Sequence, residues 1–137
     1  MIIRSEEKIY NVRKKKNVPV WALDTDKCVI RHFDADTHSE TEKYYSSEHI
    51  RYHLNFSAEY HKERLRKLVD SGEIVSYLDD LDVTVSAAIE KQVEKWLDND
   101  KEYHAALNDG DLPKANGLAN MVRLCAREGV FEAMVYV

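Results

Sequence analysis

The segment EIVSYLDDLDVTVSAAIEKQVEKW, residues 73–96, has the hydrophobic spacing that decides the fold class. Its apolar residues recur at steps of three and four positions, at Leu78, Leu81, Val85, Ile89, Val93 and Trp96. This spacing places them on one face of an α-helix, while the opposite face is charged. The sequence therefore predicts a long amphipathic helix that buries these side chains together in a core.

The chain before this segment also has helical spacing. Ser47 is a candidate start for a short helix that runs through Leu54. Ser57 is a candidate cap for a second helix, which ends at Ser71-Gly72 because glycine tolerates the left-handed conformation of a helix stop. The inward positions expected for the second helix are His61, Leu65, Leu68 and Val69.

A last helix is expected after the chain break at residues 108–111. Asp111 is its candidate cap, and Pro113 is tolerated because proline fits a first helical turn. Gly129 allows a break near the end of this helix. The side chains expected to face the core are Leu118, Met121, Val122 and Cys125, with Phe131 and Met134 as further candidates.

The N-terminal part is rich in β-branched and aromatic residues. Residues 18–23 and 28–33 form two such runs around a polar turn, which predicts a β-hairpin, and residues 9–12 are a candidate third strand or irregular arm. Residues 34–41 read as a polar connection. The expected fold is mainly α (α+β), with a β-hairpin arm over residues 1–36 followed by a three- or four-helix bundle over residues 37–137.

Composition fits one globular domain. The chain has 137 residues, of which 44% are apolar and 33% charged, with four glycines and two prolines. These values disfavour a disordered or collagenous chain. Residues 1–137 contain no apolar run of membrane-spanning length, so we expect a cytoplasmic protein without membrane contact. In that compartment Cys28 and Cys125 are expected to be free thiols, which excludes a disulfide scaffold or a zinc ribbon.

Charge is distributed unevenly along the chain. The net charge is −5, yet residues 1–23 hold six Lys and Arg against two Asp and Glu, whereas residues 71–111 hold three against eleven. A basic run lies next to Tyr10 and Trp21. It could contact a phosphate backbone while these aromatic side chains stack on bases. The alternative is that the run serves solubility. The candidate nucleic-acid-binding residues are Arg13, Lys14, Lys15 and Lys16.

Acidic residues in the long helix are candidates for binding a basic protein. Glu90, Glu94 and Asp98 recur every four residues and share one helix face, where like charges repel each other. If this face is a docking surface, a bound basic partner would offset the repulsion. The simpler alternative is a solvated face next to Lys91 and Lys95. The candidate partner-binding residues are Asp79, Asp80, Asp82, Glu90, Glu94 and Asp98.

Catalytic chemistry has weaker support. His49 and His53 are four residues apart and would share a helix face, and residues 32–38 collect four potential metal ligands. Such short clusters occur often without a metal, and no glycine-rich phosphate loop or nucleophile elbow is present. We therefore assign no catalytic residue, metal or cofactor. A small metal-dependent hydrolase ranks last among the functions considered, and it would use His32, Asp34, Asp36, His49 and His53.

A family resemblance covers well over half of the chain. The matching features are a basic helix with His61, Arg64, Leu65 and Leu68, then Ser71-Gly72 followed by YLDDLD at residues 77–82, and the final helix ending in EAMVYV at residues 132–137. With these features, residues 52–137 resemble the TnpV family of small proteins encoded by bacterial transposons. The resemblance implies an accessory protein of a mobile element, and it carries over no catalytic residues.

Two functions of different kinds follow as expectations. The first is a non-enzymatic accessory or regulatory protein of a mobile element or phage, which binds a protein such as a recombinase or nuclease and through its basic arm contacts DNA. The second is an inhibitor of a host nucleic-acid-guided nuclease, of the anti-CRISPR kind, in which acidic helices mimic nucleic acid. The sequence leaves the oligomeric state open.

Overall fold

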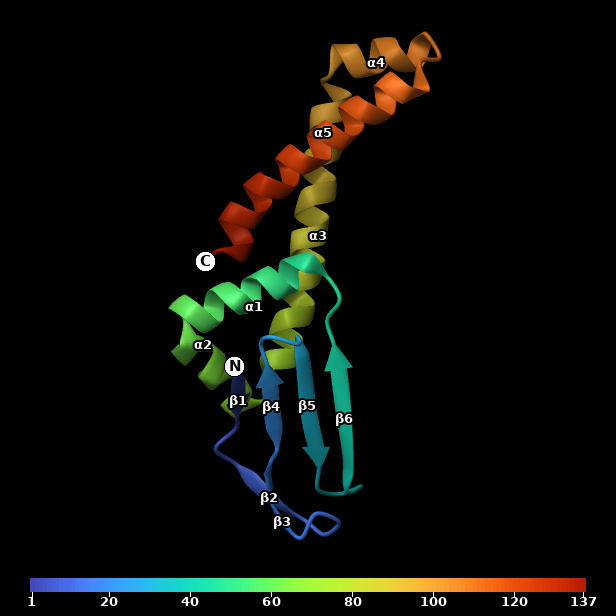
Figure 1. Cartoon of the computed structure of the whole chain (residues 1–137). Helices are drawn as coiled ribbons and strands as arrows, with labels where there is room; N and C mark the ends of the chain where they lie inside the picture. The colour runs from blue at the N-terminus through green and yellow to red at the C-terminus, as the bar shows by residue number, and fades with distance from the viewer. The chain divides into compact units, whose positions relative to one another are not determined.

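The computed structural model describes all 137 residues, which form two compact units. The N-terminal unit contains residues 1–82 together with Tyr136 and Val137, and the C-terminal unit contains residues 83–135. Helix α3 (Ile74–Asp98) contributes to both units. Figure 1 labels the elements along the chain.

Six short strands form the β part of the N-terminal unit. Four of them make an antiparallel sheet in the order β1-β4-β5-β6, and the other two form a separate hairpin, β2-β3. The strands of the sheet are β1 (Ile2–Arg4), β4 (Trp21–Asp24), β5 (Val29–Asp34) and β6 (Ser39–Tyr44), and those of the hairpin are β2 (Lys8–Asn11) and β3 (Lys16–Pro19).

The structure confirms the turn of the predicted β-hairpin and its two strands, which are β4 and β5. Strands β4 and β5 pair from Asp24 with Val29 to Trp21 with His32. The Asp24 carboxylate accepts hydrogen bonds from the backbone N–H groups of residues 26 and 27, at 3.0 and 3.1 Å, which closes the turn. Val18 is not part of this hairpin, because it pairs with Ile9 in the β2-β3 hairpin.

Strand β6 corrects the prediction of a polar connection over residues 34–41. All six of its residues, SETEKY, are exposed, so the sequence lacks the hydrophobic alternation that identifies a strand. Its backbone nevertheless pairs with β5 in continuous register from Asp34 with Ser39 to Val29 with Tyr44. Pairing with a buried neighbour, rather than burial of its own side chains, defines this edge strand.

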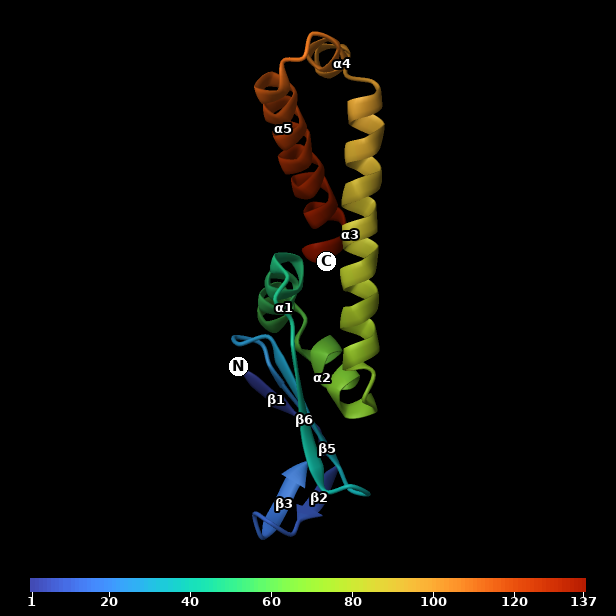
Figure 2. The same ribbon diagram turned by 90° about the vertical axis from the view of Figure 1, so that its right-hand side faces the viewer.

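Helices cover one face of the sheet (Figure 2). They are α1 (Glu48–Tyr60), α2 (Lys62–Ser71) and the first turns of α3. Leu23 and Ile30 of the sheet lie in one hydrophobic core with residues of all three helices, where Leu54, Leu65 and Leu78 are fully buried. This core includes the first part of the apolar face predicted for the long helix.

The boundary between α1 and α2 differs from the prediction. Ser57 does not cap a helix, since it is fully buried within α1 and the helix continues to Tyr60. His61, an expected core residue, is exposed at the junction. The predicted stop at Gly72 is confirmed, because Gly72 has φ +75° and its N–H donates to the Val69 carbonyl at 3.2 Å.

The C-terminal unit is helical. It contains the rest of α3, then α4 (Lys101–Asn108), α5 (Leu112–Val130) and a closing π-helical turn, Phe131–Val135. The Asp111 carboxylate accepts a hydrogen bond from the Lys114 N–H at 3.3 Å, which confirms the predicted cap. Asp100 caps α4 in the same way through the Tyr103 N–H at 3.1 Å. The sequence did not identify α4 as a separate helix.

Core-facing residues of α5 also correct the prediction. Ala115, Ala119 and Ala126 are buried, whereas Met121 is 64% exposed and Cys125 is exposed. Small residues therefore occupy the buried side of α5, whereas Met121 and Cys125 lie outside it. In α3, Val85 and Val93 are buried as predicted, but Trp96 is 38% exposed.

The fold is therefore mixed α+β rather than mainly α. Its N-terminal unit depends on a four-stranded antiparallel sheet packed against helices, which is more β structure than the expected hairpin arm. No helix combines the length and apolar character needed to cross a membrane.

Gly72 provides a test of the sheet–helix contact. A Cβ at this position would lie 2.9 Å from Nε1 of Trp21, whereas a Cβ at Gly110, which also has positive φ, would meet nothing within 4 Å. We expect Gly110→Ala to cost about 1–2 kcal/mol for the left-handed conformation alone. Gly72→Ala should lower the free energy of unfolding further, because Trp21 must also move. Urea unfolding followed by circular dichroism measures both, and equal costs would contradict the proposed clash.

Candidate nucleic-acid interface

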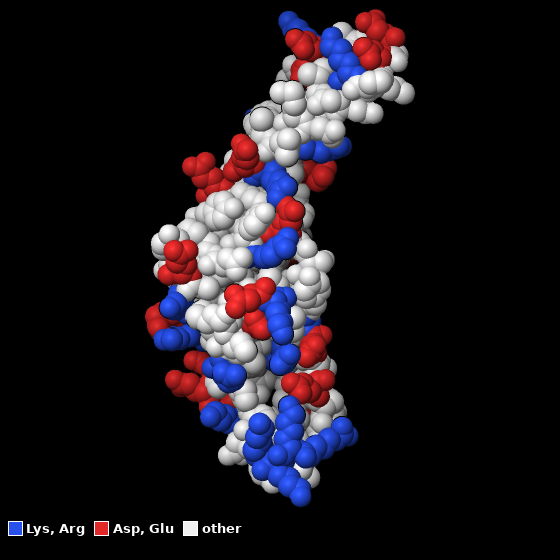
Figure 3. Space-filling view, viewed as in Figure 1, with Lys and Arg blue, Asp and Glu red and all other residues white.

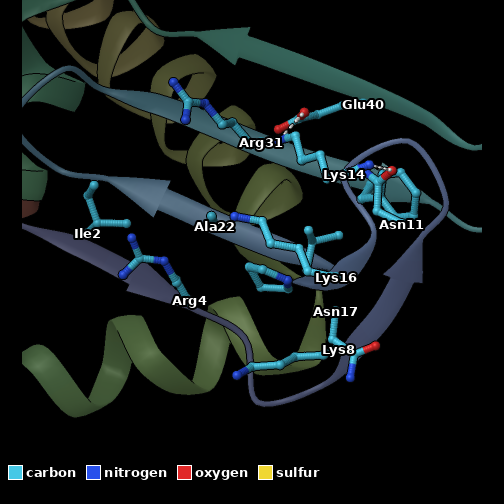
Figure 4. Close-up of a pocket in the computed structure, with 13 residues that line it drawn as sticks. Ile2, Arg4, Lys8, Asn11, Lys14, Lys16, Asn17, Ala22, Arg31 and Glu40 are labelled. Atoms are coloured by element: carbon cyan, nitrogen blue, oxygen red, sulfur yellow. Dashed lines mark hydrogen bonds and ion pairs between the residues drawn. The ribbon is translucent and has the colours of Figure 1, made fainter.

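A hollow of about 470 Å³ lies between the β2-β3 hairpin and the face of the sheet that the helices leave open (Figure 4). Residues of all six strands and of the β2-β3 turn line it. Its position follows from strand alternation: Ile3 and Ile30 point into the core, so their neighbours Ile2, Arg4 and Arg31 point to the opposite face. The hollow is lined from the same strands that build the core.

Five cationic side chains line this hollow, and they come from separate segments. They are Arg4 of β1, Lys8 of β2, Lys14 of the turn, Lys16 of β3 and Arg31 of β5. Two of them have a carboxylate partner: Lys14 lies 3.6 Å from Glu40, and Arg31 lies 3.0 Å from Glu42.

Arg4, Lys8 and Lys16 form no ion pair within the chain. All three side chains are exposed, and Figure 4 shows them around the same hollow. No carboxylate of the chain contacts these three charges directly, so solvent ions gather around them. An anion bound in the hollow would displace those ions, which is the source of most of the affinity of proteins for phosphate backbones.

The predicted basic run is divided by the hairpin. Lys14 and Lys16 line the hollow, whereas Arg13 and Lys15 are exposed in the turn and do not line it. The Asn11 side-chain oxygen accepts the backbone N–H groups of Arg13 and Lys14, at 3.0 and 3.2 Å, and so fixes the turn. Lys and Arg side chains gather around this end of the N-terminal unit in Figure 3.

Sequence reasoning missed Arg4, Lys8 and Arg31. Each stands alone in the chain, so no run of basic residues indicates it. The available signal was strand alternation, because Arg4 and Arg31 each directly follow a core residue of the sheet. The register that aligns both with Ala22 of β4 could not be read without knowing that β1 pairs with β4.

The aromatic residues predicted to stack on bases have different roles. Tyr10 is 52% exposed on the β2-β3 hairpin and is free of the core. Trp21 stacks on His32, with ring centroids 4.0 Å apart, and packs against the hydrophobic core. Only Tyr10 is therefore placed as a stacking platform near the basic residues.

Two of the predicted acidic residues have partners within the N-terminal unit. Asp79 accepts hydrogen bonds from Lys43 Nζ at 2.7 Å and from the Tyr45 hydroxyl at 2.9 Å. The hydrogen bond from Lys43 is the main cause that lowers the pKa of Asp79. Asp82 pairs with His49, and Asp80 is exposed. Asp79 and Asp82 thus connect α3 to β6, the following segment and α1.

The other three acidic candidates, Glu90, Glu94 and Asp98, lie in the part of α3 that belongs to the C-terminal unit. All three are exposed, and none forms an ion pair. Their charges remain available to a basic partner surface.

The candidate metal ligands are dispersed. His32 stacks on Trp21, and the Asp34 carboxylate caps the following turn through the Asp36 N–H at 2.9 Å. His53 is fully buried and lies 2.8 Å from the Tyr77 hydroxyl. No group of three or more His, Cys, Asp or Glu side chains is arranged to hold a metal ion.

A serine and a histidine do meet in the N-terminal unit. Ser57 Oγ lies 3.5 Å from His53 Nε2, and the Arg64 guanidinium donates to Ser57 Oγ at 2.8 Å. Both Ser57 and His53 are fully buried, so a substrate has no access to them. Burial also raises the pKa of the neighbouring Tyr77. This group is a buried polar network that links α1, α2 and α3.

Comparisons with protein-family models, with curated proteins and with solved structures found no match to this chain.

The Asp79 interaction predicts a pH-dependent stability. Because its pKa is lowered in the folded state, Asp79 contributes stability above its unfolded pKa of about 4, and this contribution is lost as pH falls through the folded pKa. Asp79→Asn should therefore lower the urea midpoint at pH 7 and lower it less at pH 3. The neighbouring Asp80→Asn is the control. A midpoint difference independent of pH would contradict an ionic role for Asp79.

Proposed function

We propose that this chain is a non-enzymatic binding protein that holds the phosphate backbone of a nucleic acid against the hollow between the β2-β3 hairpin and the sheet. In this proposal it serves as an accessory protein of a mobile genetic element and acts in the cytoplasm. Its helices, expected from the sequence to form a bundle, provide surface for a protein partner such as a recombinase or nuclease.

The observation that carries this proposal is the convergence of Arg4, Lys8 and Lys16. Three cations without a carboxylate partner come from three strands and surround one concave surface. Repulsion among these like charges raises the free energy of the unbound protein, and a bound polyanion would relieve this repulsion. The net charge of −5 does not oppose this, because the acidic excess is concentrated in residues 71–111.

The shape of the site favours a single strand. A concave basic surface with one exposed aromatic side chain nearby, Tyr10, is the combination by which proteins follow a flexible single-stranded backbone. A duplex presents a stiff convex surface and would need a projecting element for its grooves. We therefore expect tighter binding of single-stranded than of double-stranded oligonucleotides.

The test is the salt dependence of oligonucleotide binding. The triple substitution Arg4→Ala, Lys8→Ala and Lys16→Ala should weaken binding and reduce the slope of log K against log salt by about 2, since each lost contact with a single strand contributes about 0.7. Fluorescence anisotropy with a labelled single strand and its duplex measures both quantities.

A matched control removes the same charge elsewhere. Lys62, Lys67 and Lys91 are exposed, form no ion pair and do not line the hollow. Their replacement by alanine changes the net charge equally and should leave the slope near its original value. Equal loss of slope in the two triple variants would show that binding depends on total charge and not on this site.

A second candidate function uses the acidic face of α3. Glu90, Glu94 and Asp98 are exposed without ion pairs, and repulsion at this spacing is mildly destabilising. A basic protein groove, including one that normally receives nucleic acid, would relieve this repulsion. This keeps the anti-CRISPR type of inhibitor as the alternative to nucleic-acid binding.

Charge reversal tests this alternative. Replacing Glu90, Glu94 and Asp98 with lysine should abolish capture of a nuclease or recombinase from host lysate, because the attraction to a basic groove becomes repulsion. The exposed acidic residues Glu59, Asp109 and Glu132, reversed in the same way, are the control for net charge. Unchanged capture by the first variant would show that the acidic face is only solvated.

A further inference from the structure

Helix α5 exposes a row of apolar residues along the side opposite its buried alanines. Met121 is 64% exposed and Leu124 is 60% exposed, and Cys125 is exposed beside them. With their neighbours on the same side of the helix they form what we call the α5 seam: Lys114, Gly117, Leu118, Met121, Leu124, Cys125 and Glu128.

This distribution is the reverse of that in an ordinary surface helix. Ala115, Ala119 and Ala126 are buried, while the larger Met121 and Leu124 face solvent. Each exposed large side chain forgoes part of the hydrophobic free energy that burial would provide. A contiguous exposed apolar surface of this kind marks an interaction site.

Trp96 extends the apolar surface beside the seam. With Leu118, Met121, Val122 and Cys125 it lines a shallow groove of about 400 Å³ within the C-terminal unit. Asp100 is the one charged residue of this groove, and its carboxylate already accepts the Tyr103 N–H as a helix cap. The surface available to an occupant is therefore almost wholly apolar.

The seam follows a seven-residue repeat, in which Met121 and Leu124 are the apolar positions. Lys114, Met121 and Glu128 are separated by seven residues each, and Gly117 and Leu124 occupy the intervening positions with the same repeat. A repeat of seven keeps one stripe of a helix facing a partner helix over its whole length. The occupant that fits best is thus another α-helix.

Charge at the two ends of the seam selects its partner and direction. Lys114 and Glu128 lie equally far from Met121, one on each side. If a second α5 packs antiparallel with Met121 at the centre, Lys114 lies opposite the partner's Glu128, and both ends gain an ion pair. In a parallel arrangement Lys114 would face the partner's Lys114, which is repulsive.

Side-chain volumes agree with the antiparallel arrangement. Leu118 and Cys125 lie on one flank of the seam, and Gly117 and Leu124 lie on the other. A two-fold axis keeps each flank against the same flank of the partner, so Leu118 lies beside the partner's Cys125 and Gly117 beside the partner's Leu124. Each leucine thus meets a smaller residue, which lets the helices approach closely on both sides of the central methionines. The contact is self-complementary, as a two-fold symmetric interface requires.

We propose that a second copy of this chain docks on the α5 seam, antiparallel and with its two-fold axis at Met121. Two such seams then cover each other, and the groove beside Trp96 lies at the edge of the contact. This inference is independent of the nucleic-acid site, which lies in the N-terminal unit.

The first experiment compares Met121→Lys with Asn120→Lys by sedimentation equilibrium. Both positions are exposed, so both variants should fold, as circular dichroism will verify. The wild type and Asn120→Lys should be dimers. Met121→Lys, which places two ammonium groups at the axis, should weaken the dimer by at least about tenfold, a change of 1.4 kcal/mol. A wild-type chain that is monomeric at all concentrations overturns the proposal.

A charge swap tests the direction. Lys114→Glu and Glu128→Lys should each weaken the dimer, and the double variant should restore it, because the ion pairs form again with exchanged signs. Each substitution also places its new charge at the favourable end of the helix dipole, so lower stability of α5 cannot explain the loss. Absence of restoration in the double variant contradicts the antiparallel pairing.

Cross-linking distinguishes the two directions. Under mild oxidation, Leu118→Cys should give a covalent dimer through a disulfide to the partner's Cys125, while the wild type should not cross-link. Cys28 is buried and does not interfere. A wild-type dimer linked through Cys125 to the partner's Cys125 would indicate parallel helices and overturn the proposal.

Discussion

Burial of one face of the four-stranded sheet against three helices is the contact on which the N-terminal unit depends. Leu23 and Ile30 at the centre of the sheet are almost fully buried against α1, α2 and α3, where Leu54, Leu65 and Leu78 have no exposed surface. Since side chains alternate along a strand, this burial also determines which residues face away from the core. The same alternation directs Arg4 and Arg31, two of the cations around the hollow, away from the core.

Polar contacts of α3 hold peripheral parts of the N-terminal unit in place. Asp79 holds Lys43 of β6 and Tyr45 just after it, and Asp82 holds His49 of α1. These pairs attach the exposed edge strand and the first helix to α3 beside the hydrophobic core, which includes Tyr45 and Leu78. Asp79 and Asp82, which the sequence predicted as partner-binding residues, therefore connect elements within the fold.

The C-terminal unit follows a different principle, close helix approach. Alanines at positions 115, 119 and 126 allow α5 to lie near its neighbours, but they bury little apolar area. The larger Met121 and Leu124 remain outside, and their exposure is the physical basis for assigning a second copy to this surface.

The sequence by itself determined the features that depend on neighbouring residues. The length and apolar face of α3, the stop at Gly72, the cap at Asp111 and the turn at Asp24 all arise from local spacing and from short side-chain to backbone bonds. Two of the five cations of the basic site, Lys14 and Lys16, were also visible as part of a run. Tertiary structure alone decided the rest. Strand β6 has no hydrophobic alternation, Arg4 and Arg31 meet only through pairing of β1 and β5 with β4, and the buried side of α5 depends on the helix beside it. These features are set by contacts between residues distant in the chain, which local patterns do not encode.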